Sequence, residues 1–366
     1  MDSSNVYGST ETEAEDVRDK EDRALLAVTS SRGFEGRDLL PTCRMAVADN
    51  REPESCDLNN CGAGCTFVGG DFRVNEMPAL TVQHTVWVRE HNRIATQLKR
   101  INPTWRAERV FQETRRIVNA EWQNIIFSEW LPILLGRNYV QEFGLTPLKS
   151  GYSSDYNPAT DPSISNEFAA AAFRFGHTLL TPNIPGRDEN GRNTTFLELR
   201  DAFNTGVFLQ EKGFIEDTVR GQSQEPVPAF DGNFAEGLSL FRRFNKNIDF
   251  EDVMNHLFET EEGNNGGLDL LALNIQRGRE HGIPGYRCVG LSVLTKFNKS
   301  KKIFSGATQR CATLLHSHRS TREVFVKFSR TTKTLTSSPE EALRIPTWMV
   351  WSVKRSCASS ESSSCG

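Results

Sequence analysis

The side chains with the greatest capacity for chemistry are gathered in three short segments, at residues 70–78, 173–178 and 273–282. In the second segment Arg174 and His177 are three residues apart, so a helix would place them on one face. In the third segment Asn274 and Arg277 have the same spacing. An imidazole can ligate a metal, an amide can orient that imidazole, and guanidinium groups can bind carboxylates. Together these groups indicate a site for a metal-bearing, anionic ligand.

The first segment adds a cation, a carboxylate and a thioether in the loop before Pro78, namely Arg73, Glu76 and Met77. Within an apolar helical cage, the three segments would form a haem pocket or a site for another small anionic cofactor. Each residue taken alone has a simpler interpretation. A histidine in an apolar helix is usually a hydrogen-bonded core residue, and Arg174 could pair with an acid.

The elements that must position these residues are helical. A helix is predicted from Pro78, which suits a first helical turn, to Asn102, where Pro103 stops it. Its inner face is expected to hold Leu80, His84, Trp87, His91, Ile94 and Leu98. A second helix is predicted over 108–131 and closed by Gly136, with Phe111, Thr114, Val118, Trp122 and Ile125 inward. Further helices are predicted over 164–180, 196–209, 250–258 and 268–280, and strand patterns are nearly absent before residue 287. The fold class is therefore mainly α.

Composition excludes several classes of protein. The chain has 366 residues, of which 37% are apolar and 25% charged, and a net charge of −4. Wholesale disorder and a dedicated nucleic-acid binder are disfavoured, and no apolar run is long enough to span a bilayer. Residues 287–366 hold 14 Lys and Arg against four acids, a net of +10. We therefore predict a boundary after residue 286, followed by a basic Ser/Thr-rich tail of no assigned fold.

Four of the eight cysteines lie close together, at Cys43, Cys56, Cys61 and Cys65. They could hold a metal, but no further His or Cys follows at a zinc-site spacing, so disulfides are favoured. Two glycosylation sequons, at Asn193 and Asn298, also indicate an oxidising, exported location. Residues 1–30 contain no apolar signal segment.

Several motifs resemble those of the animal haem peroxidase family. They are Glu76-Met77-Pro78, Arg89-Glu90-His91-Asn92-Arg93, Asn102-Pro103-x-Trp105, Phe173-Arg174-Phe175-Gly176-His177 and the run from Leu273 to Tyr286. Their order and separations match the family, and the resemblance covers nearly everything from Asp2 to Tyr286. It implies a haem-peroxidase-type helical domain over residues 1–286, incomplete at both ends.

The resemblance also implies a role for most of the chemical residues. His177 would be the proximal ligand of the iron of haem b, and Asn274 would orient its imidazole. Arg174 and Arg277 would hold a haem propionate. Arg73 would be the distal arginine, which polarises bound peroxide by its charge.

Other motif positions carry finer implications. Glu76 matches the position that forms an ester with a haem methyl group. Met77 matches a position that in some members is linked to a haem vinyl group, and an ordinary packing methionine is an equal interpretation. Asp2 and Ser4 match two ligands of a calcium loop whose other ligands would precede residue 1. The remaining matched histidines are interpreted as hydrogen-bonded residues of packed helices: His84, His91 and His281.

The implied function is a secreted haem peroxidase that reduces hydrogen peroxide and oxidises a phenolic, tyrosyl or halide donor, as in peroxide catabolism and the response to oxidative stress. The family's distal histidine belongs to a segment that would precede residue 1. We therefore expect slow turnover, because general acid–base catalysis contributes roughly 10²–10⁴-fold. The alternatives are a catalytically silent haem-binding or extracellular interaction protein derived from a peroxidase and, from a different class, a cysteine-cluster metal protein.

Overall fold

The computed structural model describes residues 2–30, 37–43, 66–154, 156–159, 163–181, 183–204, 206, 209, 213–227, 257–258 and 267–285. The chain divides into two compact units. The first consists of Met1–Ile126, Thr181–Val227 and Asn255–Gly267, and the second of Phe127–Leu180, Pro228–Met254 and Leu268–Gly366. The tail predicted from residue 287 lies outside the described residues, as do Cys56, Cys61, Cys65 and Asn298.

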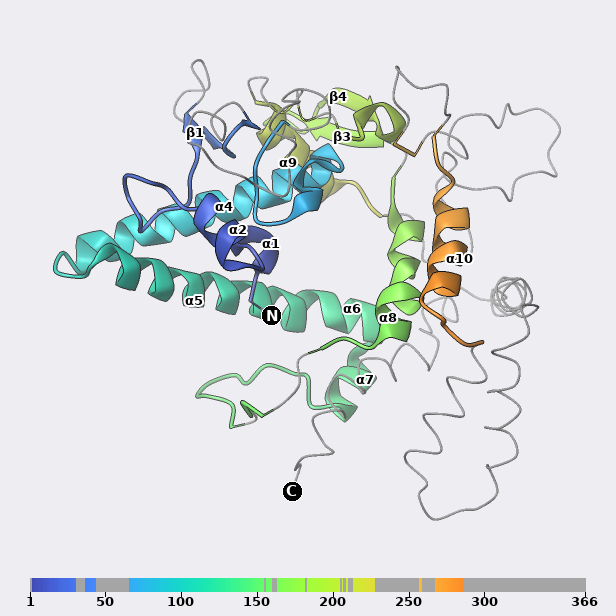
Figure 1. Ribbon diagram of the computed structural model, residues 1–366, viewed down its shortest axis with the longest axis horizontal. Helices are drawn as coiled ribbons and strands as arrows, with labels where there is room; N and C mark the ends of the chain where they lie inside the picture. Colours follow the sequence, from blue (N-terminus) through green and yellow to red (C-terminus); the bar gives the residue numbers. More distant parts are fainter. Residues whose placement is uncertain are drawn as a thin grey trace, which may run out of the picture. The chain divides into compact units, whose positions relative to one another are not determined.

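Two long antiparallel helices, α4 (Pro78–Ile101) and α5 (Ala107–Ile125), form the frame of the first unit (Figure 1). Pro78 stands in the first turn of α4 and Asn102 is its C-cap, as the sequence predicts. The inner face of α4 is wider than predicted, and its buried residues are Pro78, Thr81, Val82, His84, Thr85, Val88, His91, Ile94 and Ala95. Leu80, Trp87 and Leu98 are only partly buried, so they lie at the edges of this face.

The second long helix ends earlier than the sequence predicts. Val110, Phe111, Thr114 and Val118 of α5 are buried, but Ile125 is 47% exposed. A π-helical turn (Ile126–Trp130) follows, and then the short helix α6 (Leu131–Leu135). Pro132 accounts for this break, because it has no N–H for the carbonyl four residues earlier and its ring would clash there. Gly136, with φ at 77°, ends α6.

The N-terminal segment packs on α4 and α5 through Tyr7, which ends the short helix α1 (Ser4–Tyr7) and is 1% exposed. Its ring meets that of Phe111 edge-on, with the centroids 5.9 Å apart. Helix α2 (Glu11–Asp16) begins with a reciprocal cap between Thr10 and Glu13. The antiparallel strands β1 (Thr29–Ser30) and β2 (Asp38–Leu39) complete this part of the unit.

The helix predicted over 196–209 is wrong. Strand β4 (Asn193–Glu198) pairs antiparallel with β3 (Asn183–Arg187), and a 3₁₀ turn (Leu199–Ala202) follows. Local turn chemistry overrides the helical pattern here: the Asp188 carboxylate accepts the N–H groups of Asn190 and Arg192, each at 2.8 Å, and closes the hairpin. Helix α9 (Phe214–Gln224) packs on β3.

The second unit contains α7 (Arg137–Glu142), α8 (Asn166–Ala170) and α10 (Leu270–Glu280). The helix predicted over 164–180 is divided, because Ala171 (φ −134°, ψ −64°) separates α8 from a 3₁₀ helix (Ala172–Leu179). Helix α10 confirms the prediction over 268–280, with the Asp269 side chain accepting two N–H groups of its first turn. The helix predicted over 250–258 lies almost wholly outside the described residues.

The fold is mainly helical, as predicted. Within the part of the chain that the structure describes, strands form only two two-stranded sheets. No helix in that part is long and apolar enough to cross a membrane.

Candidate functional site

The second unit brings His177 of the 3₁₀ helix into contact with Asn274 of α10. The side-chain nitrogen of Asn274 lies 2.9 Å from Nδ1 of His177. An amide turned by half a revolution presents its oxygen instead, which accepts a hydrogen bond from Nδ1–H. In that tautomer the lone pair of the ring is on Nε2, which has no hydrogen-bond partner among the described residues. The histidine is thus held at one nitrogen and open at the other.

The surroundings keep this imidazole neutral. Burial, and then the charge of Arg174, lower the pKa of His177, while the contact with Asn274 opposes this effect. A neutral ring is the form that binds a metal. Nε of Arg174 is itself buried and has no hydrogen-bond partner in the part of the chain that the structure describes. A buried guanidinium N–H without a partner favours an anionic group beside it.

Arg277 lies on the same helix as Asn274, but its side chain is engaged differently. It is exposed and forms an ion pair with Glu280, one turn further along α10. Its guanidinium is therefore held by its own helix.

A second amide–imidazole contact joins α8 to the end of α10. Nδ1 of His281 lies 2.7 Å from Oδ1 of Asn166, and the Asn166 amide donates to the His281 carbonyl at 3.1 Å. His281 was expected inside a packed helix; instead it is the exposed C-cap of α10. The contact holds the C-terminal end of α10 against the start of α8.

The first unit carries Arg73 on a 3₁₀ turn (Phe72–Asn75), and Glu76 and Met77 directly after it, where the chain leads into α4. Arg73 projects from this turn, with its side chain 58% exposed and paired with Asp71. Glu76 is half-buried, and burial raises the pKa of its carboxyl, an effect that the charge of Arg73 opposes. Met77 packs against an apolar cluster formed by Ile184, Leu199 and Ala202.

Two residues that the sequence analysis did not single out fix this turn. The side chain of Asn75, 4% exposed, accepts the Phe67 N–H at 2.9 Å and donates to the Phe67 carbonyl at 2.7 Å. The Thr81 hydroxyl donates to the Val74 carbonyl at 2.6 Å. A polar residue inside a loop leaves no periodic signal, although the spacing of Asp71 and Arg73 is typical of an Asx turn.

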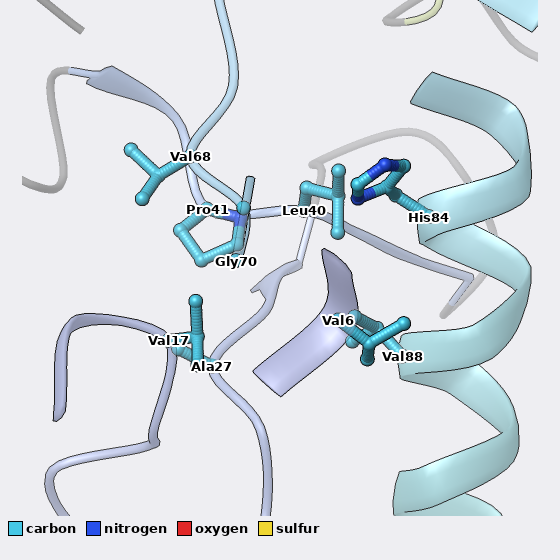
Figure 2. A pocket seen from close by; sticks show the side chains of 10 residues that line it. Val6, Val17, Ala27, Leu40, Pro41, Val68, Gly70, His84 and Val88 are labelled. Atoms are coloured by element: carbon cyan, nitrogen blue, oxygen red, sulfur yellow. The ribbon is translucent and has the colours of Figure 1, made fainter. Parts of the chain in front are cut away.

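The two buried histidines of α4 differ in their hydrogen bonds. His91 accepts from the Tyr7 hydroxyl at 2.9 Å and donates to the Ala24 carbonyl at 3.2 Å, as expected of a core histidine. Nδ1 of His84 has no hydrogen-bond partner among the described residues. The His84 side chain borders a pocket of about 10 Å³ that is otherwise lined by apolar side chains and the Gly69–Gly70 backbone (Figure 2). That space is about the size of a single water molecule.

Of the residues predicted for calcium binding and for disulfides, the structure describes Asp2, Ser4 and Cys43. Oδ1 of Asp2 accepts the backbone N–H of Ser4 at 3.2 Å. Among the described residues, no three His, Cys, Asp or Glu side chains form a group that could hold a metal ion. Cys43 is disulfide-bonded.

A neutral, oriented imidazole beside a guanidinium N–H that has no partner among the described residues is an arrangement typical of proteins that ligate a metal-bearing cofactor through histidine. The family model of animal haem peroxidases matches residues 1–324. The chain therefore belongs to the animal haem peroxidase family. The match runs past Tyr286, where we expected the resemblance to end.

The relatives are peroxidases of greater length. Over 290 residues the chain is 35% identical to chorion peroxidase of Drosophila melanogaster, covering 78% of this chain and 32% of the relative. It is 38% identical to the human peroxidasin homolog over 290 residues, again 78% of this chain but 18% of that protein. Peroxidase A of Dictyostelium discoideum has the same fold, with a TM-score of 0.58 and 22% identity over all of this chain and 66% of that one. The chain thus spans about a third of the length of chorion peroxidase.

Proposed function

We propose that the chain is a haem-dependent peroxidase domain that reduces hydrogen peroxide while it oxidises a phenolic, tyrosyl or halide donor. The contact between Asn274 and His177 carries the proposal. A neutral imidazole that is held at Nδ1 and open at Nε2 is what a haem iron takes as its axial ligand. The unpartnered Nε of Arg174 suits a haem propionate.

The residues present fit haem b in the following way. His177 would bind the iron, and Arg174 and Arg277 would hold a propionate, which for Arg277 means exchanging Glu280 for the ligand. The half-buried carboxyl of Glu76 would attach haem covalently as an ester. Bound haem supplies the redox chemistry. We assign Met77 a packing role, since its side chain contacts the apolar cluster described above.

Arg73 would polarise the peroxide. Its side chain is more than half exposed and carries a permanent charge, which the neighbouring carboxylate stabilises. A guanidinium aimed at the oxygen that gains negative charge lowers the barrier to breaking the O–O bond. This role needs no change in the protonation of Arg73.

We also propose an extracellular location and a calcium site that includes Asp2 and Ser4. Asn193, the acceptor of one glycosylation sequon, is exposed at the start of β4, and Cys43 is disulfide-bonded. Both features suit an oxidising compartment. The Asp2 carboxylate is exposed, so it is open to a cation.

Haem reconstitution tests the proposal. The purified chain mixed with ferric haem should give a Soret band that shifts when cyanide is added. His177→Ala should abolish this band because it removes the axial ligand. His281→Ala is the matched control. It breaks the contact between His281 and Asn166 of α8, the second amide–imidazole contact of this unit, and should leave the band intact. No spectral binding by the unmodified chain would contradict the proposal.

The same preparation separates the active from the silent alternative. A peroxidase oxidises a phenol such as guaiacol only when hydrogen peroxide is present. A haem-binding protein without this activity would show the Soret band and the cyanide shift but no oxidation above that of free haem.

A further inference from the structure

Among the described residues, the guanidinium of Arg73 is held by one carboxylate, that of Asp71. Nε of Arg73 donates to Oδ1 at 2.8 Å and Nη2 donates to Oδ2 at 2.7 Å. The backbone N–H of Arg73 also donates to Oδ1, at 2.9 Å. Paired bonds of this kind fix the plane of a guanidinium as well as its position. One side chain therefore sets both the start of the 3₁₀ turn and the direction of the arginine.

The two partners differ in exposure: Asp71 is the more buried member of the pair and Arg73 extends toward solvent. The Asp71 side chain is 18% exposed and that of Arg73 is 58% exposed. A guanidinium has five N–H donors, so two bound by Asp71 leave about three for a ligand. Nη1 carries two of these and has no hydrogen-bond partner among the described residues. The hydrogen bonds from Arg73 lower the pKa of Asp71, so the carboxylate stays ionised.

The loop that carries Asp71 is itself held closely by the first unit. A Cβ atom added to Gly70 would lie 2.6 Å from the backbone nitrogen of Gly8 and 2.7 Å from the Val6 carbonyl. The loop backbone therefore lies directly against the end of α1. On its other side, Asn75 ties the 3₁₀ turn to Phe67. Asp71 is thus a fixed point from which the longer arginine side chain extends.

We propose that Asp71 is the positioning residue of Arg73, holding its three remaining N–H donors in the orientation in which they meet peroxide or another small anion. This inference rests on the function proposed above, in which Arg73 polarises peroxide. Without the Asp71 carboxylate, the arginine would turn among its rotamers or toward Glu76, the next acid along the chain. Its charge would remain but its direction would be lost.

Asp71→Asn is the informative variant. Asparagine is a good capping residue and keeps the size of the side chain, so the turn should persist. Its NH₂ group donates and cannot accept, so with the remaining oxygen bound to Nε no acceptor faces Nη2 and the two-point hold is lost. The haem-loaded chain should then react with peroxide about 10–100-fold more slowly, with its Soret band unchanged, as expected for losing one charged hydrogen bond.

Glu90→Gln provides a matched control. Glu90 holds Arg93 in the same two-point manner, with distances of 2.7 and 2.5 Å, on an exposed part of α4. Breaking that pair removes one carboxylate–guanidinium contact without touching Arg73. The reaction with peroxide should keep the rate of the unmodified chain.

A second measurement needs no haem. In the haem-free chain labelled with ¹⁵N-arginine, the Nε–H resonance of Arg73, assigned by its absence in Arg73→Lys, should be protected from solvent exchange. Asp71→Asn should speed this exchange by about tenfold or more, because the bond from Nε to an ionised acceptor is replaced by a weaker one. The pKa of Glu76 should also fall in Asp71→Asn. In the unmodified chain the negative charge of Asp71 helps to raise this pKa, and the variant removes that charge.

Distinct results would overturn the two proposals. Unchanged Nε–H exchange in Asp71→Asn would show that Asp71 does not hold Arg73. If Asp71→Asn does not fold, Arg73→Lys tests the positioning role instead. Lysine keeps the positive charge but lacks the planar guanidinium that binds a carboxylate at two points. This variant should therefore also react with peroxide at least about tenfold more slowly. Full reactivity in Arg73→Lys would overturn the positioning role. Absence of haem binding by the unmodified chain would instead contradict the proposed function and leave the exchange measurement to judge the contact.

Discussion

Two buried histidines on α4 should make the fold sensitive to acid above the pH at which most of its carboxylates titrate. Burial lowers the pKa of His84 and of His91 from 6.5 to about 4. The side chains are 3% and 0% exposed, and unfolding returns both to water. Between pH 6.5 and 4 the unfolded chain therefore binds more protons than the folded chain. Stability rises with pH through this window and is lost as the pH falls.

The size of the effect follows from the two pKa values. At about 1.36 kcal/mol per pH unit, the fall from 6.5 to about 4 corresponds to about 3.4 kcal/mol for each histidine. About 2 kcal/mol of this is lost between pH 7 and pH 5. The two histidines together would remove about 4 kcal/mol, a large part of the ~5–15 kcal/mol that stabilises a typical domain.

Urea unfolding at pH 7 and pH 5 measures this loss. His84→Asn and His91→Asn should each lose about 2 kcal/mol less than the unmodified chain over the same pH interval, whatever their stability at pH 7. Taking the difference between chains cancels the carboxylates that also titrate. His281→Asn, at an exposed position, should lose as much as the unmodified chain. An equal loss in all four chains would refute the reasoning.

Four further outcomes are expected. Gly221→Ala should destabilise the first unit by about 1–3 kcal/mol or more in urea unfolding, because the new Cβ would lie 2.0 Å from the Pro185 carbonyl oxygen. Gly278→Ala, on α10 with no described residue within 4 Å of its Cβ, should instead be neutral or stabilise by up to about 1 kcal/mol. Asn274→Ala should weaken haem binding about 10–100-fold in a spectral titration, since it removes the partner of the proposed axial ligand; unchanged affinity would contradict that role. Glu76→Gln should leave haem fully extractable into acidified organic solvent, whereas retention equal to the unmodified chain would exclude an ester at this position.

The elements that could be predicted are those whose ends carry their own chemical signals. Pro78 and Asn102 bound α4 because one suits a first turn and the other precedes a proline. The 164–180 segment keeps the helical spacing of its apolar residues, yet Ala171 leaves the helical region. The residue type gives no sign of this break in the helix, since alanine favours a helix. Tertiary context decides there, whereas local turn chemistry decides where β4 replaces the predicted helix.

The site divides in the same way. The pairing of His177 with Asn274 could be anticipated because both lie in segments rich in chemical groups. The engagement of Arg277 by Glu280 is a local alternative, three residues apart, that the sequence equally allows. Asn75, which ties its loop to a segment eight residues earlier, acts through backbone atoms. Nearly every residue carries a backbone N–H and carbonyl, so the sequence alone does not show which of them a side chain such as that of Asn75 will bind.

Geometry, more than pKa, distinguishes the proposed ligand from the other histidines. Burial lowers the pKa of His84, His91 and His177 alike, so all three are neutral near pH 7 and each could in principle bind a metal. Both ring nitrogens of His91 are already hydrogen-bonded, and His84 borders a space of about 10 Å³, which is too small for a cofactor. Only His177 among these three combines one nitrogen held by an amide with a second that has no partner in the described part of the chain. The property that selects a ligand here is an open lone pair with a fixed direction, and this arises from the meeting of two segments nearly a hundred residues apart.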